Sequence, residues 1–128
     1  MQKDVYRGWR IIKGGDMQKV FKFEIDITGD QSGERFQGSF SYSRPTIGKK
    51  RSIIQEEAVL NEGFNKDIPE ILFINKSVAF LTHCIIECPQ WFKDSKFGLD
   101  LEDENLLVEI INKVNSFEDK VAEELAKE

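Results

Sequence analysis

Apolar and charged side chains alternate in the segment from residue 20 to residue 27, strictly so from residue 21 onward. The apolar positions in this segment are Phe21, Phe23, Ile25 and Ile27. Alternation resumes between residues 36 and 42, where Phe36, Phe40 and Tyr42 share one side. A period of two is typical of half-buried strands, and the Gly-, Asp- and Ser-rich segment between them has turn chemistry. The pattern predicts a β-hairpin over residues 20–43, whose aromatic face must be covered because a two-stranded ribbon alone is marginally stable.

Helical patterns occupy the region from residue 48 to residue 126. The first covers residues 49–61 and is followed by Gly63, a typical capping glycine. The second covers residues 68–87, and the order Asp67, then proline and glutamate at its start suits an N-cap with a capping box. Apolar residues surround most of this second helix, so we expect it to be buried on several sides at the centre of the core.

A third helix is predicted from residues 100–103 to near the end of the chain. Acidic residues mark its start, where negative charge favours the positive end of the helix dipole. Apolar residues then recur at the a and d positions of a heptad. They are Leu107, Ile110, Val114, Phe117 and Val121. This stripe indicates packing within the chain's own bundle or, alternatively, extension into a neighbouring subunit, so all five residues are candidates for self-association.

The connector between the second and third helices contains three large aromatic side chains, Trp91, Phe92 and Phe97. A connector that only reverses the chain needs Gly, Asn and Ser. These rings therefore either plug one end of the helical bundle or anchor a partner protein, because buried aromatic side chains dominate interface energetics.

Residues 1–19 also allow two interpretations, one inside the chain's own fold and one in contact with another subunit. Trp9 and its neighbours form either an edge strand over residues 5–12 or an arm that reaches a neighbouring subunit.

Length and composition fit one domain. A chain of 128 residues with 40% hydrophobic and 32% charged residues can bury one core and is too short for two. The predicted elements make residues 1–128 a single α+β domain. In it, the β-hairpin packs on a bundle of three helices, the last of them long, and residues 5–12 are the candidate for a third strand.

The charge and hydropathy of the chain exclude several classes of protein. A net charge of −5 argues against general nucleic-acid binding, which needs clustered Lys and Arg. The one basic run, residues 49–51, fits a solvated helix start. No stretch is apolar enough to span a membrane, and the N-terminal residues do not resemble a signal peptide. We therefore expect a cytosolic protein or a part of an assembled particle.

Residues that carry chemistry are few. Cys84 and Cys88 lie four residues apart on one face of the predicted second helix, where we expect reduced, buried thiols. His83 points about 100° away from Cys84 on a helix, so the two cannot easily share a proton. The acids at residues 100–104 lack the spacing of a calcium loop and are explained by helix capping. No catalytic residue, metal or cofactor is predicted, and an enzyme is not expected.

Three segments carry a resemblance to a known group of proteins. They are residues 36–48 (FQGSFSYSRPTIG), residues 88–92 (CPQWF) and residues 99–107 (LDLEDENLL). In this order, with helices between them, they resemble small tail-morphogenesis proteins of long-tailed bacteriophages, and the tail assembly chaperones in particular. The resemblance covers residues 36–118. Its most specific pieces are Arg44-Pro45-Thr46-Ile47-Gly48 and Pro89-Gln90-Trp91-Phe92.

The resemblance implies a non-enzymatic role. Chaperones of this group bind the long tape-measure protein in the host cytoplasm, keep its apolar helical segments soluble, and often self-associate. The expected partners are therefore a phage tape-measure protein and other copies of the chain, without nucleic acid, membrane or cofactor. The alternative is a structural virion component, such as a tail or connector subunit that stays in the particle.

Overall fold

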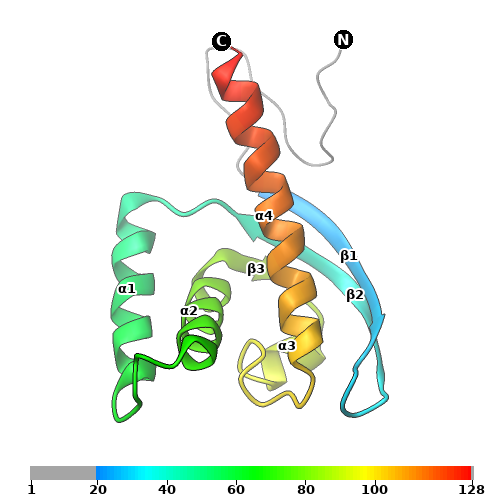
Figure 1. Cartoon of the computed structure of the whole chain (residues 1–128). Helices are drawn as coiled ribbons and strands as arrows, with labels where there is room; N and C mark the ends of the chain where they lie inside the picture. Colours follow the sequence, from blue (N-terminus) through cyan, green and yellow to red (C-terminus); the bar gives the residue numbers. More distant parts are fainter. Residues whose placement is uncertain (1–19, 128) are drawn as a thin grey trace.

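The computed structural model describes residues 20–127, which form a three-stranded antiparallel sheet and four helices (Figure 1). The elements are β1 (Val20–Thr28), β2 (Arg35–Ser43), α1 (Ile47–Asn61), α2 (Pro69–Cys84), β3 (Ile85–Glu87), α3 (Gln90–Asp94) and α4 (Glu104–Ala126). In Figure 1, α4 crosses the β1–β2 ribbon, and α1 and α2 lie next to each other away from β1. The predicted α+β class with a long last helix is confirmed.

The predicted hairpin is confirmed with nearly the predicted bounds. β1 and β2 pair antiparallel in continuous register, from Val20 opposite Ser43 to Thr28 opposite Arg35. The rings of Phe23 and Phe40 are both buried and stack with their centroids 5.4 Å apart. The apolar face of the hairpin that the alternation predicts is therefore the face that packs against the rest of the described chain.

The third strand comes from a part of the chain where a helix was predicted. The helix expected over residues 68–87 ends at Cys84, and β3 pairs antiparallel with β2 opposite Ser41 and Tyr42. The two isoleucines of β3 continue the apolar pattern of α2, so periodicity alone extends the helix too far. The edge of β2 offers backbone hydrogen-bond partners that favour the strand instead. Residues 5–12, the other candidate for a third strand, lie outside the described residues.

The first helix forms as predicted and begins two residues earlier. The side chain of Thr46 caps α1 by accepting a hydrogen bond of 3.2 Å from the amide of Lys49. At the other end, Gly63 follows the capping residue and has a φ of 83°, a conformation that favours glycine. Residues 49–51 are exposed, as expected for a solvated helix start.

The second helix is less buried than its composition suggests. Its N-cap position falls on Ile68, which has no capping side chain, so the predicted capping role of Asp67 is wrong. Most of its C-terminal half is buried, but Leu72 in its first half is 36% exposed. The expectation of a helix buried on several sides therefore holds only for the second half. One face of α2 has no covering element among the described residues.

The heptad stripe of α4 lies within the chain's own core. All of its members are buried, namely Leu107, Ile110, Val114, Phe117 and Val121. The ring of Phe117 stacks on that of Phe21 with centroids 4.5 Å apart and planes 9° from parallel. It also meets the ring of Tyr42 edge-on at 5.9 Å. Packing inside the chain accounts for the stripe.

Asp103 holds the hairpin turn and does not cap α4. It occupies the N-cap position, but its side chain bonds no amide of the helix. Its carboxylate accepts hydrogen bonds from the amides of Gln31 and Ser32, at 2.7 and 2.8 Å. Asn105 adds two bonds of 3.1 Å to the same end of the hairpin. The capping interpretation was wrong for Asp103 because its partners lie more than 70 residues away in sequence, where local patterns carry no information.

Candidate functional site

A groove runs along α1, bordered by α2 and α4 over most of its length and by α1 and the segment after it at the far end. It consists of three hollows of about 460, 540 and 570 Å³. The first and second hollows share Pro45, Lys50, Phe80 and Asn115, and the second and third share Ile54 and Glu57. Neighbouring hollows share lining residues, and we call the three together the helix groove.

Each of the three helices presents one regular face to the helix groove. The faces consist of Lys50, Ile53, Ile54 and Glu57 on α1, Phe73, Lys76, Ser77 and Phe80 on α2, and Ile111, Asn115 and Glu118 on α4. On α1 and α2 the spacing is i, i+3, i+4 and i+7, the spacing of one side of a helix. Three helix faces that converge on an open trough leave the place that a fourth helix takes in a bundle.

The middle of the helix groove is apolar and only partly covered. Ile54 is 67% exposed, whereas Phe73, Phe80 and Ile111 are half-buried. Other large apolar side chains are exposed along α1 and α2 and between them. They are Ile47, Phe64, Ile68 and Leu72. The exposed Val59 of α1 lines none of the three hollows. A concentration of exposed apolar side chains over one pair of helices is typical of a surface that binds another protein.

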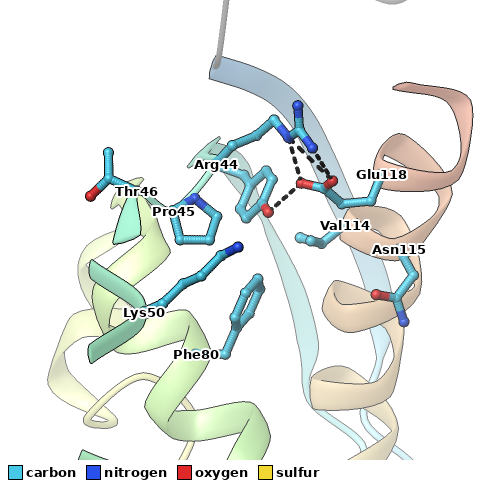
Figure 2. Close-up of a pocket in the computed structure, with 9 residues that line it drawn as sticks. Arg44, Pro45, Thr46, Lys50, Phe80, Val114, Asn115 and Glu118 are labelled. Carbon is cyan, nitrogen blue, oxygen red and sulfur yellow. Dashed lines mark hydrogen bonds and ion pairs between the residues drawn. The ribbon is translucent and has the colours of Figure 1, made fainter. Parts of the chain in front are cut away.

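One end of the helix groove is polar (Figure 2). There Glu118 of α4 accepts a hydrogen bond of 2.6 Å from the hydroxyl of Tyr42. It also pairs with Arg44, with 3.0 Å between Nη2 and Oε1. Burial, and then the bond to the Glu118 carboxylate, raise the pKa of Tyr42 far above its usual value. The network ties the end of β2 to α4 and closes this end of the groove.

The charge of the helix groove changes along α1. The first turn of α1 holds no acidic residue and carries Lys50 in the groove. The far end of α1 brings Glu57 and Glu62 into the third hollow, together with Lys66 from the following loop. The groove is therefore basic beside the start of α1 and mixed beside its end.

The aromatic residues of the predicted plug pack on the chain's own sheet. Trp91 donates its Nε1 hydrogen to the backbone oxygen of Gln37 at 3.0 Å. Phe92 is fully buried and meets the ring of Phe40 edge-on at 5.2 Å. Phe97 is half-buried and lies edge-on to Phe92 at 5.5 Å. This arrangement favours the interpretation that these rings pack inside the chain over the interpretation that they anchor a partner protein.

The remaining candidate residues do not form an exposed surface within the described part of the chain. The α4 stripe lies in the core, although Val114 also lines the polar end of the helix groove. Trp9 lies outside the described residues. Self-association through these side chains therefore stays a prediction, and the structure offers the helix groove as the open surface.

The helix groove was missed at the level of sequence. Its central residues, Ile54, Phe73 and Phe80, were not recognised as a surface because each falls in an apolar helical pattern. A signal was present in α2, whose apolar residues cover most of the helix. In a chain of 128 residues with few helices, such a helix has too few neighbours to cover every side.

The histidine and cysteines do not form a reactive group. Nε2 of His83 lies 3.6 Å from Oε1 of Glu56, across the contact between α2 and α1. Cys84 ends α2 and Cys88 follows β3, so the prediction that both thiols share a helix face is wrong. Burial raises the pKa of the Cys84 thiol to about 11, which suppresses the nucleophilic thiolate.

Within residues 20–127, no group of His, Cys, Asp and Glu side chains is placed to hold a metal ion. In the same part of the chain, no helix has the length and apolar character needed to cross a membrane. Comparison of the chain with protein-family models, with curated protein sequences and with solved structures gives no match.

Proposed function

We propose that this protein is a non-enzymatic tail assembly chaperone of a long-tailed bacteriophage. In this role it binds amphipathic helical segments of the tape-measure protein in the helix groove. The apolar stripe of such a segment packs between α1, α2 and α4, and its polar side faces water. Helix-in-groove binding of this kind is a common mode of peptide recognition.

The observation that carries the proposal is a space between three helix faces that residues 20–127 leave uncovered. The middle of the groove combines half-buried rings, Phe73 and Phe80, with the exposed side chain of Ile54. Burying such apolar surface against a partner yields about 25 cal/mol per Å² before the costs of association. A partner with an apolar stripe therefore gains most by lying along the groove.

The position of the sequence resemblance adds support. Within the segment Arg44-Pro45-Thr46-Ile47-Gly48, the side chains of Arg44, Pro45 and Thr46 line the polar end of the helix groove. The other specific piece, residues 89–92, packs on β2 and holds the sheet in place. Of the two most specific pieces of the resemblance, one thus borders the proposed binding surface and the other supports the fold.

An open groove suits a chaperone that must release its client. Because its walls leave Ile54 largely exposed, a bound helix keeps one side in solvent and can be removed by assembling tail-tube subunits. We place this activity in the host cytoplasm, where the tape-measure protein is synthesised. Self-association of the chaperone belongs to the same proposal and would bring several grooves to one long client.

The test is co-expression with overlapping fragments of the tape-measure protein of the same phage. The proposal predicts that helical fragments stay soluble and co-purify with this chain, while the same fragments aggregate when expressed alone. Fragments that aggregate equally with and without this chain contradict it. Mass spectrometry of purified virions separates the alternative, since high copy number in the particle indicates a structural tail or connector subunit.

A further inference from the structure

The helix groove contains two lysines whose amino groups have no partner in the described part of the chain. Lys50 belongs to the α1 face of the groove and Lys76 to its α2 face. Among residues 20–127, no hydrogen bond or ion pair engages either amino group. Both side chains lie at the border of the same apolar hollow, which is lined by Ile54, Phe73 and Phe80.

Lys50 points into the groove. Figure 2 shows its side chain reaching from α1 into the polar hollow, between Pro45 and Phe80 and toward α4. The nearby carboxylate of Glu118 is already engaged by Arg44 and Tyr42. The ammonium group of Lys50 therefore faces a hollow whose own acidic group is occupied.

Lys76 stands within the apolar face of α2. Phe73 lies three residues before it and Phe80 four residues after it on the same side of the helix. The acidic residue that lines the central hollow, Glu57, forms no ion pair with either lysine. It lies two turns along α1 from Lys50, about 10 Å away along the axis.

We propose that the helix groove selects amphipathic helices whose apolar stripe is bordered by Asp or Glu side chains. This inference rests on the proposed function and names the chemical class of its client. A carboxylate on one border of the client stripe meets Lys50, and a carboxylate on the other border meets Lys76. The apolar stripe between them packs on Ile54, Phe73 and Phe80.

The net charge of the protein opposes the proposed preference for acidic helices. With a formal charge of −5, the molecule as a whole attracts basic peptides and repels acidic ones. A preference for acidic peptides can therefore come only from local charges at the groove. Partly exposed ion pairs are individually weak, so two of them together predict a preference of about tenfold in affinity at low salt.

The experiment uses the full chain and three designed amphipathic peptides of 15 residues, the length of α1. The peptides share one apolar stripe and carry Glu, Gln or Lys on both borders, with equal helicity verified by circular dichroism. The inference predicts the tightest binding for the Glu peptide and the weakest for the Lys peptide, measured by fluorescence anisotropy. The preference decreases as salt is added.

Charge-reversed variants locate the effect. The double variant Lys50→Glu, Lys76→Glu is expected to reverse the order of the peptides. The control Lys113→Glu changes an exposed lysine of α4 outside the groove and is expected to keep the order. All three lysines are exposed, so none of these changes disturbs the core.

Two outcomes overturn the inference, and they are distinguishable. If the three peptides bind equally, and Ile54→Glu abolishes the binding of all of them, the charge preference is wrong but the groove is still the binding site. If no peptide binds, or if Ile54→Glu leaves peptide binding unchanged, the groove itself is not the site and the proposed function falls with the inference.

Discussion

The carboxylate of Asp103 accepts hydrogen bonds from both the amide and the hydroxyl of Ser32, at 2.8 and 2.6 Å. These bonds join the start of α4 to the turn of the β1–β2 hairpin. The approach is close because Gly29 has no side chain: a Cβ there would lie 2.2 Å from Cγ of Asp103. The start of α4, which forms a wall of the groove further along, is therefore held in part by a carboxylate bonded to the hairpin turn.

Acid should weaken this connection. The hydrogen bonds from Ser32, opposed by burial, hold the pKa of the Asp103 carboxyl below its usual value. A carboxyl with a depressed folded-state pKa stabilises the fold above its unfolded value of about 3.9, and this contribution is lost as the pH falls through the lower folded value. Asp103→Asn should therefore lower stability to urea at about pH 7, and the difference from wild type should shrink below about pH 4.

A matched carboxyl separates this effect from general acid destabilisation. Glu102 is the exposed neighbour of Asp103, and Glu102→Gln should leave the urea midpoint unchanged at neutral pH. If Asp103→Asn and Glu102→Gln have equal stability at every pH, the bonds to the hairpin turn contribute nothing to stability.

Gly38 should tolerate no side chain because α3 begins directly above it. A Cβ at Gly38 would lie 2.1 Å from Cγ of Pro89. Gly38→Ala should cost about 1–3 kcal/mol of the free energy of unfolding, the usual cost of overpacking. In Gly48→Ala, the nearest atom is 3.9 Å from the added Cβ, and α1 should gain about 0.5–1 kcal/mol. Chemical denaturation of both variants tests the prediction, and equal effects of the two substitutions would refute the contact.

Two phenylalanines should separate folding from binding. Phe92→Ala removes a fully buried ring and should cost about 3–5 kcal/mol of the free energy of unfolding. Phe64 is 58% exposed beside the third hollow, so Phe64→Ala should change stability by less than about 0.5 kcal/mol. The same Phe64 variant should bind tape-measure fragments more weakly. A large loss of stability in Phe64→Ala would show that this ring belongs to the core.

The two thiols should differ in reactivity toward Ellman's reagent. Burial raises the pKa of both, to about 11 for Cys84, which is also fully covered. In the folded protein at about pH 8, the Cys88→Ser variant should therefore react only as fast as it unfolds, while Cys84→Ser should react sooner through the half-buried Cys88. Rapid labelling of folded Cys88→Ser would contradict the placement of Cys84.

Local patterns predicted the parts of the fold that depend on local chemistry. The alternation around Phe23 and the heptad positions around Val114 both reflect burial on one side of a single element, so their periods identify the element. β3 has no such signature, because its pairing with Tyr42 depends on a strand more than 40 residues earlier. Asp103 was misassigned for the same reason.

The candidate site could not be predicted because it is a surface that no helix or strand of the described chain covers. Ile54 and Phe80 look like core residues in the sequence, and their apolar character does not tell which side of α1 or α2 stays uncovered. The aromatic residues at positions 91 and 92 were prominent as possible anchors, yet they pack on β2. An open groove follows only from the positions of three helices in space.

The central claim is that a tape-measure helix lies in the helix groove, and the affinity of one fragment tests it most directly. Ile54 and Val59 are both exposed apolar residues of α1, 67% and 60% accessible, and Ile54 lines the groove while Val59 faces elsewhere. Calorimetric titration should show at least about tenfold weaker binding for Ile54→Glu, since a carboxylate would be buried against the apolar stripe of the client. Val59→Glu should bind like wild type. Equal affinities of the two variants would contradict the claim.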